Sequence, residues 1–239
     1  MESTELASRV AGIAALAEPI RRDLYLFVAA QQTPVSRDEA SAGLGVARHT
    51  AKFHLDKLVA EGLLEVEYKR PSDRRGPGAG RPTKRYRRSQ HQLAVTLPER
   101  QYELAARVLA SAIDRSRQGG VPIEDSLHEA AAAFGARLGG RSDASSVAPQ
   151  DADETLTAAC EVLAGAGYEP HRDGNVITLT NCPFDALAHD YTQLVCGINL
   201  DLLTGVADSL QPARLCARLA PQPGRCCVVL SPPEDQPAT

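Results

Sequence analysis

Apolar residues recur every three or four positions through the first sixty residues, the spacing that places them on one face of an α-helix. After Gly62 the pattern changes to an alternation of apolar and polar side chains, as in a β-strand with one buried face. The order helix, helix, turn, helix, strand, loop, strand is that of a winged helix-turn-helix. The first helix is expected at residues 19–30. The second starts at Ser36, a helix cap with Glu39 three places on, and ends at the turn of Gly43 and Gly45. The third helix is expected at 47–61, the two strands at 63–70 and 84–88, and the loop between them at 71–82.

The rest of the chain mixes helical and strand-like patterns. Residues 98–117 carry the clearest helical stripe, and its apolar positions between Leu104 and Ile113 are too many to face water. We expect this stripe to be either core or a dimer seam, and favour the seam. A polar stretch of small residues at 140–150 is typical of a linker. Further helices are expected at 122–138, 152–165 and 184–209, with hairpins across 173–175 and at 214–231.

The predicted fold class is therefore α+β, in three parts. Residues 1–95 are expected to form the winged helix-turn-helix domain, residues 96–140 a helical dimerisation segment, and residues 141–239 a C-terminal α+β sensor domain. A chain of 239 residues with 43% apolar side chains is long enough for two compact cores. No stretch approaches 18 apolar residues and no basic region precedes an apolar one near residue 1, so we expect no membrane span and no secretory signal. A cytoplasmic, nucleoid-associated bacterial protein is the corresponding prediction.

Charge and cysteine separate along the chain. The net charge is only −4, but residues 68–88 hold nine Lys or Arg against the single acid Asp73. Every cysteine lies beyond residue 159, in a part of the chain that is acidic from residue 151 onward. A basic segment of this density is typical of a surface that binds nucleic acid. Six cysteines in an intracellular chain indicate metal or redox chemistry more than a disulfide framework.

The N-terminal part offers two groups of DNA-contacting residues. The start of the third helix is expected to enter the major groove, where Arg, His and Thr meet base edges and an exposed Phe contacts a thymine methyl. The loop that follows is expected to lay arginines on phosphates as a wing. The alternative is an ordinary solvated surface on a small helical domain. The predicted DNA contacts, to double-stranded DNA from a homodimer, are Arg48, His49, Thr50, Lys52, Phe53, Arg74, Arg75, Arg81 and Lys84.

Three cysteines are candidates for one shared metal or cluster site. Cys182 precedes Pro183, which suits the first turn of a helix, so the helix dipole is expected to lower the pKa of the Cys182 thiol. Cys196 lies in a stretch that is apolar nearly all round, interrupted by Asn199 and Asp201, and should be buried. The alternative is that each is a small buried hydrophobe, which is our expectation for Cys160. The spacings match neither a zinc finger nor a ferredoxin.

The last hairpin selects between neighbouring cysteines. With residues 221–224 as the turn, Leu219 pairs with Cys226, and alternation turns Cys226 toward the apolar face. Cys216 and Cys227 then project to the other face. Cys226 is therefore the predicted third ligand.

Four segments together resemble the SufR-like iron–sulfur repressors, winged-helix proteins akin to the ArsR and DeoR groups. They are VARHTAKFHLDKLVAEGLL (46–64), GRPTKRYR (80–87), NCPFDALAHDYTQLVCGINLDLLTGV (181–206) and RLAPQPGRCCVVL (218–230). The resemblance implies a homodimeric repressor of the Suf iron–sulfur assembly operon, with a cluster in each C-terminal domain. With its cluster such a repressor binds operator DNA, and cluster damage or loss releases it.

The family's cysteines correspond to Cys182, Cys196 and Cys226. The fourth ligand is left open among Cys216, Cys227, His189, His171 and a residue of a partner chain. We favour a [4Fe–4S] over a [2Fe–2S] cluster.

Two other readings remain at this point. The same cysteines fit a winged-helix regulator that senses zinc or thiol oxidation. An iron–sulfur electron carrier or enzyme with an incidental basic loop is the alternative from another class. Against an enzyme, the chain has no G-x-G-x-x-G, no P-loop and no supported Ser/His/Asp or paired-carboxylate arrangement.

Overall fold

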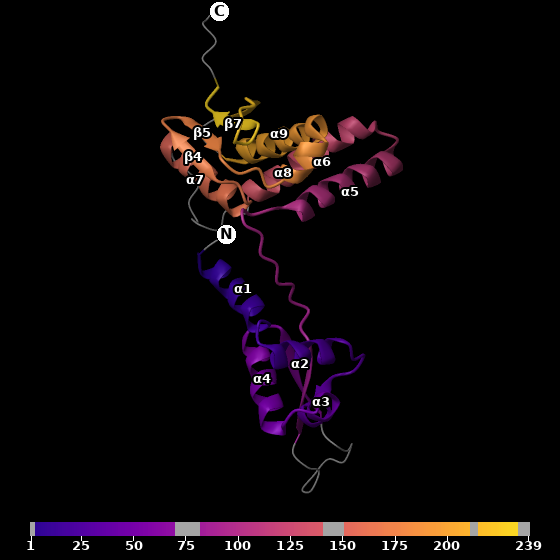
Figure 1. The fold of residues 1–239 in the computed structure, drawn as a ribbon. Coiled ribbons are helices and arrows are strands. Elements are labelled where there is room, and N and C mark those ends of the chain that lie inside the picture. The colour runs from indigo at the N-terminus through magenta and orange to yellow at the C-terminus, as the bar shows by residue number, and fades with distance from the viewer. Residues whose placement is uncertain (1–2, 70–81, 141–150, 211–214, 234–239) are drawn as a thin grey trace, which may run out of the picture. The chain divides into compact units, whose positions relative to one another are not determined.

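The computed structural model describes residues 3–69, 82–140, 151–210 and 215–233. The chain is an α+β protein that divides into two compact units, Glu2–Val95 and Thr96–Thr239 (Figure 1). The boundary between the units falls between residues 95 and 96. The predicted wing residues Arg74, Arg75 and Arg81, and nearly all of the predicted linker, lie outside the described residues. No helix in the described part of the chain is both long and apolar enough to cross a lipid bilayer.

The N-terminal unit is a helix-turn-helix domain with a small antiparallel sheet, in strand order β1-β3-β2. The predicted helices and strands are all present. Ser36 and Glu39 form a reciprocal capping box at the start of the second predicted helix, and Gly45 ends that helix with φ +66°. The first helix and the two-residue strand β1 were not expected from the sequence. The elements are α1 (Ser3–Ala15), α2 (Pro19–Ala29), β1 (Val35–Ser36), α3 (Arg37–Leu44), α4 (Arg48–Ala60), β2 (Leu64–Lys69) and β3 (Thr83–Arg88).

The core of this unit lies between α2, α4 and the sheet. Leu24 of α2 and Leu55 and Leu58 of α4 are fully buried, as helical spacing predicts, and Tyr86 of β3 closes the core from the sheet. His54 of α4 is also buried, which the sequence did not indicate. Burial of one face of α4 fixes which side of the helix is left for solvent.

The C-terminal unit combines helices with a four-stranded antiparallel sheet, in strand order β4-β5-β7-β6. Helix α6 packs against both α5 and α9 (Figure 1). The elements are α5 (Tyr102–Gly119), α6 (Ile123–Gly139), α7 (Ala152–Gly165), β4 (Pro170–Asp173), β5 (Val176–Leu179), α8 (Asp185–Asp190), α9 (Thr192–Ser209), β6 (Cys216–Leu219) and β7 (Val228–Ser231).

Two glycines allow α6 and α9 to approach each other closely. A Cβ atom on Gly135 of α6 would lie 1.8 Å from the carbonyl oxygen of Leu202, and one on Gly205 of α9 would lie 2.1 Å from that of Ala132. The two backbones are therefore in direct contact along a seam that no larger residue fits. This seam holds α9 in place.

The apolar stripe of α5 divides between core and surface. Ala105, Val108 and Ala112 pack inside the unit, whereas Ile113 is 51% exposed and Leu109 is half-buried. The inner edge is thus core, and the role of the outer edge as a dimer seam remains a prediction.

Two predictions about the C-terminal unit were wrong. The single helix over 184–209 is two helices, because the backbone of Tyr191 turns to φ −129°, ψ 52°. The last hairpin pairs Leu219 with Val228 rather than with Cys226, and the turn is correspondingly longer. Leu219 is 49% exposed instead of inward-facing, because β6 is an edge strand while β7 lies between β5 and β6 and is buried throughout.

Candidate functional site

One side of α4 faces solvent from its first turn. Arg48, His49 and Lys52 are exposed, Thr50 is half-buried, and Phe53 is 64% exposed. The N-cap residue of this helix, Ala47, makes no side-chain hydrogen bond to the first turn, so within the described part of the chain these N–H groups keep their capacity to bind an anion. Exposed basic, hydroxyl and aromatic groups at a helix start suit contacts to DNA bases and phosphates.

Several of the basic residues already have partners within the unit. Arg48 Nε donates to Asp38 Oδ1 at 2.7 Å, but both side chains are more than half exposed, so a phosphate can replace the carboxylate. Lys84, predicted to contact DNA, pairs with Asp56 and lies 5.0 Å from the ring centroid of Tyr86, so it also helps to hold β3 against α4. Its contact with DNA stays a prediction.

Asp56 is the centre of that internal arrangement. Its carboxylate accepts hydrogen bonds from Lys84, from Lys52 Nζ at 3.1 Å and from the Tyr86 hydroxyl at 3.0 Å. Partial burial alone would raise the pKa of Asp56, but these hydrogen bonds outweigh it and lower the pKa below its usual value. The contacts join α4 to β3 and hold the wing strand against the exposed helix.

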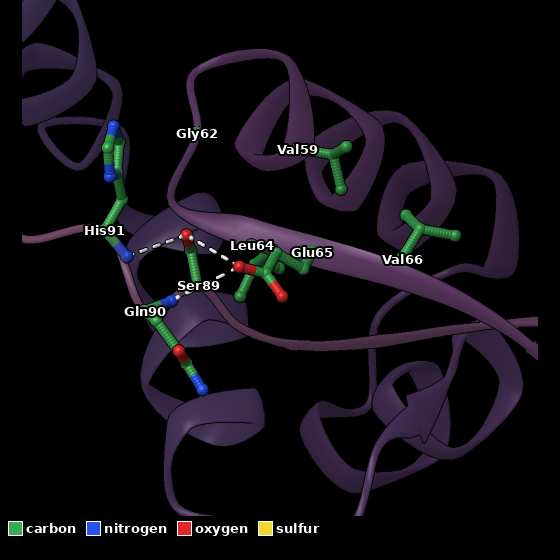
Figure 2. Close-up of a pocket in the computed structure, with 8 residues that line it drawn as sticks. All are labelled: Val59, Gly62, Leu64, Glu65, Val66, Ser89, Gln90 and His91. Carbon is green, nitrogen blue, oxygen red and sulfur yellow. Dashed lines mark hydrogen bonds between the residues drawn. The ribbon is translucent and has the colours of Figure 1, made fainter.

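A shallow hollow of about 650 Å³ lies beside β2 and the segment that follows β3 (Figure 2). Its polar groups bond to one another: Glu65 accepts from Ser89 Oγ at 3.3 Å and from the Gln90 N–H at 3.4 Å. The His91 N–H donates to Ser89 Oγ at 3.1 Å. Because these groups are satisfied internally, we assign the hollow no ligand.

Four thiols from three segments of the C-terminal unit meet in a cluster, here called the thiol cluster: Cys182, Cys196, Cys226 and Cys227. Cys182 and Cys227 each hydrogen-bond to Cys226, and Cys227 also hydrogen-bonds to Cys196. The first three were expected from the sequence to converge. Cys227 was expected on the opposite face, and that expectation was wrong.

The reason is local backbone structure. Cys226 and Cys227 lie just before β7, which begins at Val228, so the alternation of a strand does not apply to them. Both sulfurs can then face the same side. Cys216 is exposed and pairs with Ser231, at the end of β6 that lies farther along the strand from the turn carrying Cys226 and Cys227. His189 and His171, the other candidates for a fourth ligand, are exposed on α8 and β4.

The thiols do not share their protons equally. Hydrogen bonds from Cys182 and Cys227 lower the pKa of Cys226 well below the usual value of a thiol, which favours its thiolate form. Hydrogen bonding to Cys226, together with burial, raises the pKa of Cys182. The expected lowering of the Cys182 pKa was wrong: α8 begins only at Asp185, and the lowering by the Phe184 N–H is outweighed by the hydrogen bond to Cys226 and by burial.

A buried polar pair supports the thiolate from behind. Asn199 Nδ2 donates to Cys226 Sγ at 3.1 Å, and the buried Tyr168 hydroxyl donates to Asn199 Oδ1. The backbone N–H of Val228 adds a further hydrogen bond to Cys226. Sequence reasoning noted Asn199 only as an interruption of an apolar helix, and its position three residues after Cys196 was the signal for its role.

Comparison with known proteins assigns the N-terminal domain. A family model described as a helix-turn-helix domain matches residues 16–67. The match covers α2, α3, α4 and most of β2, and the chain therefore carries the DNA-binding domain of a transcription regulator. No curated protein matches the chain. The match does not reach the thiol cluster.

The donor set of the thiol cluster fits an iron–sulfur group. Thiolate sulfur is the usual ligand of such clusters, and N–H donors to the sulfurs, here from Phe184, Val228 and Asn199, are typical of their surroundings. Arg225 Nε is buried without a hydrogen-bond partner in the described structure, one residue before Cys226. The thiols hydrogen-bond to one another, and no group of three or more His, Cys, Asp or Glu among the described residues is set to hold a single metal ion.

Cys160 lies apart from the thiol cluster on α7, where burial raises the pKa of its thiol.

Proposed function

We propose that this chain is a homodimeric repressor of iron–sulfur cluster assembly genes whose DNA affinity depends on an iron–sulfur cluster held by the thiol cluster. In the loaded form the N-terminal domains bind operator DNA through the exposed face of α4. When the thiols lose the group, affinity falls and the assembly genes are transcribed. A [4Fe–4S] cluster is favoured.

The observation that carries this proposal is the meeting of four thiols from distant parts of the chain in a protein with a helix-turn-helix domain. Cys182 and Cys226 are 44 residues apart in sequence, yet their sulfurs are hydrogen-bonded. Four soft donors in contact match the usual complement of a [2Fe–2S] or [4Fe–4S] cluster. Cys227 is accordingly the proposed fourth ligand, ahead of Cys216 and His189.

An iron–sulfur cluster would supply a centre that oxidants and iron limitation destroy. The residues of the chain would bind the cluster and set its surroundings. Ligation requires thiolates, and the lowered pKa of Cys226 favours that form. Thiols that are still protonated must release their protons on loading, so loading is favoured by higher pH. Asn199 and the backbone N–H of Val228 donate to the Cys226 sulfur and fix its orientation. Phe184 and Tyr168 pack edge to face, with ring centroids 6.4 Å apart, and exclude water on that side.

An apolar surface on the C-terminal unit supports the homodimer. Ile113, Tyr191 and Leu194 are 51%, 61% and 43% exposed. Leu109 and Leu187 join Tyr191 and Leu194 around a hollow of about 260 Å³ lined by apolar and aromatic side chains. A second copy covering this surface would bury it by two-fold symmetry.

The test compares DNA affinity in loaded and metal-free protein. A DNA sequence selected from a random pool by the anaerobically loaded chain is labelled, and its binding is followed by fluorescence anisotropy. We expect loaded protein to bind about 5- to 150-fold more tightly than metal-free protein. The Cys226→Ser variant should bind like metal-free protein, and Cys216→Ser, a matched control outside the thiol cluster, like the wild type. Equal affinities of loaded and metal-free wild type contradict the proposal.

A further inference from the structure

The first residues of the C-terminal unit are bonded to the loop that carries Cys182. Residues 96–101, here called the entry segment, follow Val95 directly and lead into α5. Every force between the DNA-binding domain and the thiol cluster that is carried along the chain passes through this segment. Its contacts therefore determine whether this route along the chain can carry a change from one to the other.

The bonds between the entry segment and the Cys182 loop are dense. Arg100 Nη1 donates to the carbonyl oxygen of Cys182 at 3.0 Å and also to Asn181 Oδ1. The Gln101 N–H donates to the carbonyl oxygen of Pro183 at 3.0 Å. Asn181 Nδ2 donates in return to the carbonyl oxygen of Glu99 at 2.9 Å. Three consecutive residues, with Cys182 at their centre, thus hold three consecutive residues of the entry segment.

These contacts are buried rather than superficial. The Arg100 side chain is only 19% exposed, and Asn181 is 6% exposed. Asp185 Oδ2 lies 3.6 Å from Arg100 Nη2 and balances the buried charge. Removing one partner of such a buried, charge-assisted set leaves the others unsatisfied, so the set forms or breaks as a unit.

A second connection runs beneath the entry segment. Asn181 Nδ2 also donates to the carbonyl oxygen of Gly167 at 2.7 Å. Gly167 has φ +83°, and a Cβ atom there would lie 3.2 Å from side-chain atoms of both Glu99 and Gln101. The next residue, Tyr168, bonds to Asn199 and through it to Cys226. The entry segment therefore contacts both the loop that carries Cys182 and the turn at Gly167, which leads through Tyr168 and Asn199 to Cys226.

We propose that Arg100 and Asn181 are positioning residues that transmit the state of the thiol cluster to the DNA-binding domain through the entry segment. When Cys182 is fixed as a ligand, its carbonyl oxygen and those of its neighbours hold residues 99–101 in one position. When Cys182 is released, the Arg100 contacts loosen, residues 99–101 gain freedom, and the affinity of the protein for its operator falls. The inference rests on the proposed function and names the route of its regulation.

The main experiment measures operator affinity and iron content together. Arg100→Gln keeps a polar side chain but loses the charged Nη1 group that donates to both Asn181 and the Cys182 carbonyl oxygen. Arg107→Gln is the matched control, because Arg107 is an exposed residue of α5 that pairs with Glu103 one turn away. We expect Arg100→Gln to keep its iron, sulfide and visible spectrum while the loaded-to-metal-free affinity ratio falls from about 5- to 150-fold to near unity. Arg107→Gln should keep the wild-type ratio.

A readout without DNA separates this inference from the proposed function. The Gln101 amide, bonded to the Pro183 carbonyl, should exchange hydrogen faster after iron is removed, and in loaded Arg100→Gln it should already exchange fast. Gly167→Ala disturbs the entry segment from below and should reduce the affinity ratio in the same way, which decides the case if Arg100→Gln does not load. An unchanged ratio in both variants, or exchange at Gln101 that ignores iron, overturns the inference while the proposed function stands. Equal affinities of the two wild-type forms overturn both.

Discussion

Replacing Gly205 with alanine should destabilise the C-terminal unit, and the same change eight residues earlier in the same helix should stabilise it. A Cβ on Gly205 would lie 2.1 Å from the carbonyl oxygen, 2.9 Å from the carbonyl carbon and 3.0 Å from the Cα of Ala132, all backbone atoms. Backbone cannot rotate away, so α6 and α9 must separate by roughly 1 Å along the seam. A Cβ on Gly197 of α9 would meet nothing within 4 Å.

Both substitutions gain helix propensity, but only Gly205→Ala also creates a steric clash. Alanine gains about 1 kcal/mol of helix propensity over glycine at either position. At Gly205 overpacking against backbone costs about 3 kcal/mol, the upper part of the usual range. The net expectation is a loss of about 2 kcal/mol for Gly205→Ala, or a melting temperature lowered by about 4–8 °C. For Gly197→Ala a gain of about 1 kcal/mol and an increase of about 2–4 °C are expected.

Thermal and urea unfolding of the metal-free full-length chain, followed by far-ultraviolet circular dichroism, measure both variants against the wild type. The transition of the C-terminal unit should move in opposite directions for the two. If Gly205→Ala were as stable as Gly197→Ala, the close approach of α6 and α9 would be refuted, and with it the account of how α9 holds Cys196 and Asn199 in place.

Three further predictions concern single side chains. Phe53→Ser should weaken DNA binding measured by anisotropy. Because the ring is 64% exposed, the free energy of unfolding should change by less than about 0.5 kcal/mol. Wild-type affinity would show that this face of α4 does not contact DNA. The folded-state pKa of Asp56 is lowered, so its stabilisation of the N-terminal unit is complete above the unfolded pKa near 4 and is lost as the pH falls through the lower folded value. Urea unfolding of Asp56→Asn should accordingly show a flatter acid limb than the wild type, and parallel limbs would contradict the contacts with Lys84. Asn199→Leu should lower the free energy of unfolding by about 1–3 kcal/mol, because the buried Tyr168 hydroxyl loses its acceptor. The same variant should lose its visible absorbance faster in air. Wild-type values of both would contradict the proposed role of Asn199 in orienting Cys226.

Local patterns predicted the N-terminal unit well because its elements are set by nearby residues. The spacing of Ala51, Leu55 and Leu58 gave the buried face of α4, and the capping box of Ser36 and Glu39 marked the start of α3. Both signals lie within one or two helical turns, where periodicity and capping act. The convergence of Cys182, Cys196 and Cys226 was expected, but the predicted register of the last hairpin was wrong.

The errors arose where tertiary contacts decide the backbone. No glycine or proline marks the break at Tyr191, and the apolar pattern continues through it. Strand alternation was applied to Cys227, which lies just outside its strand. The bond between Arg100 and Asn181 joins residues 81 positions apart and has no periodicity that a single sequence displays. Close backbone contact at Gly205 is likewise a property of two helices and not of either one.

Iron and acid-labile sulfide per chain, measured in anaerobically purified Cys227→Ser and Cys216→Ser beside the wild type, test the central claim most directly. The account predicts that Cys216→Ser keeps the wild-type content and brown absorbance, because Cys216 is exposed and pairs with Ser231, at the end of the hairpin opposite the turn that carries Cys227. Cys227→Ser should lose most of its iron and sulfide or release them rapidly in air. Equal loading of the two variants, or a wild-type protein without iron and sulfide, would contradict it.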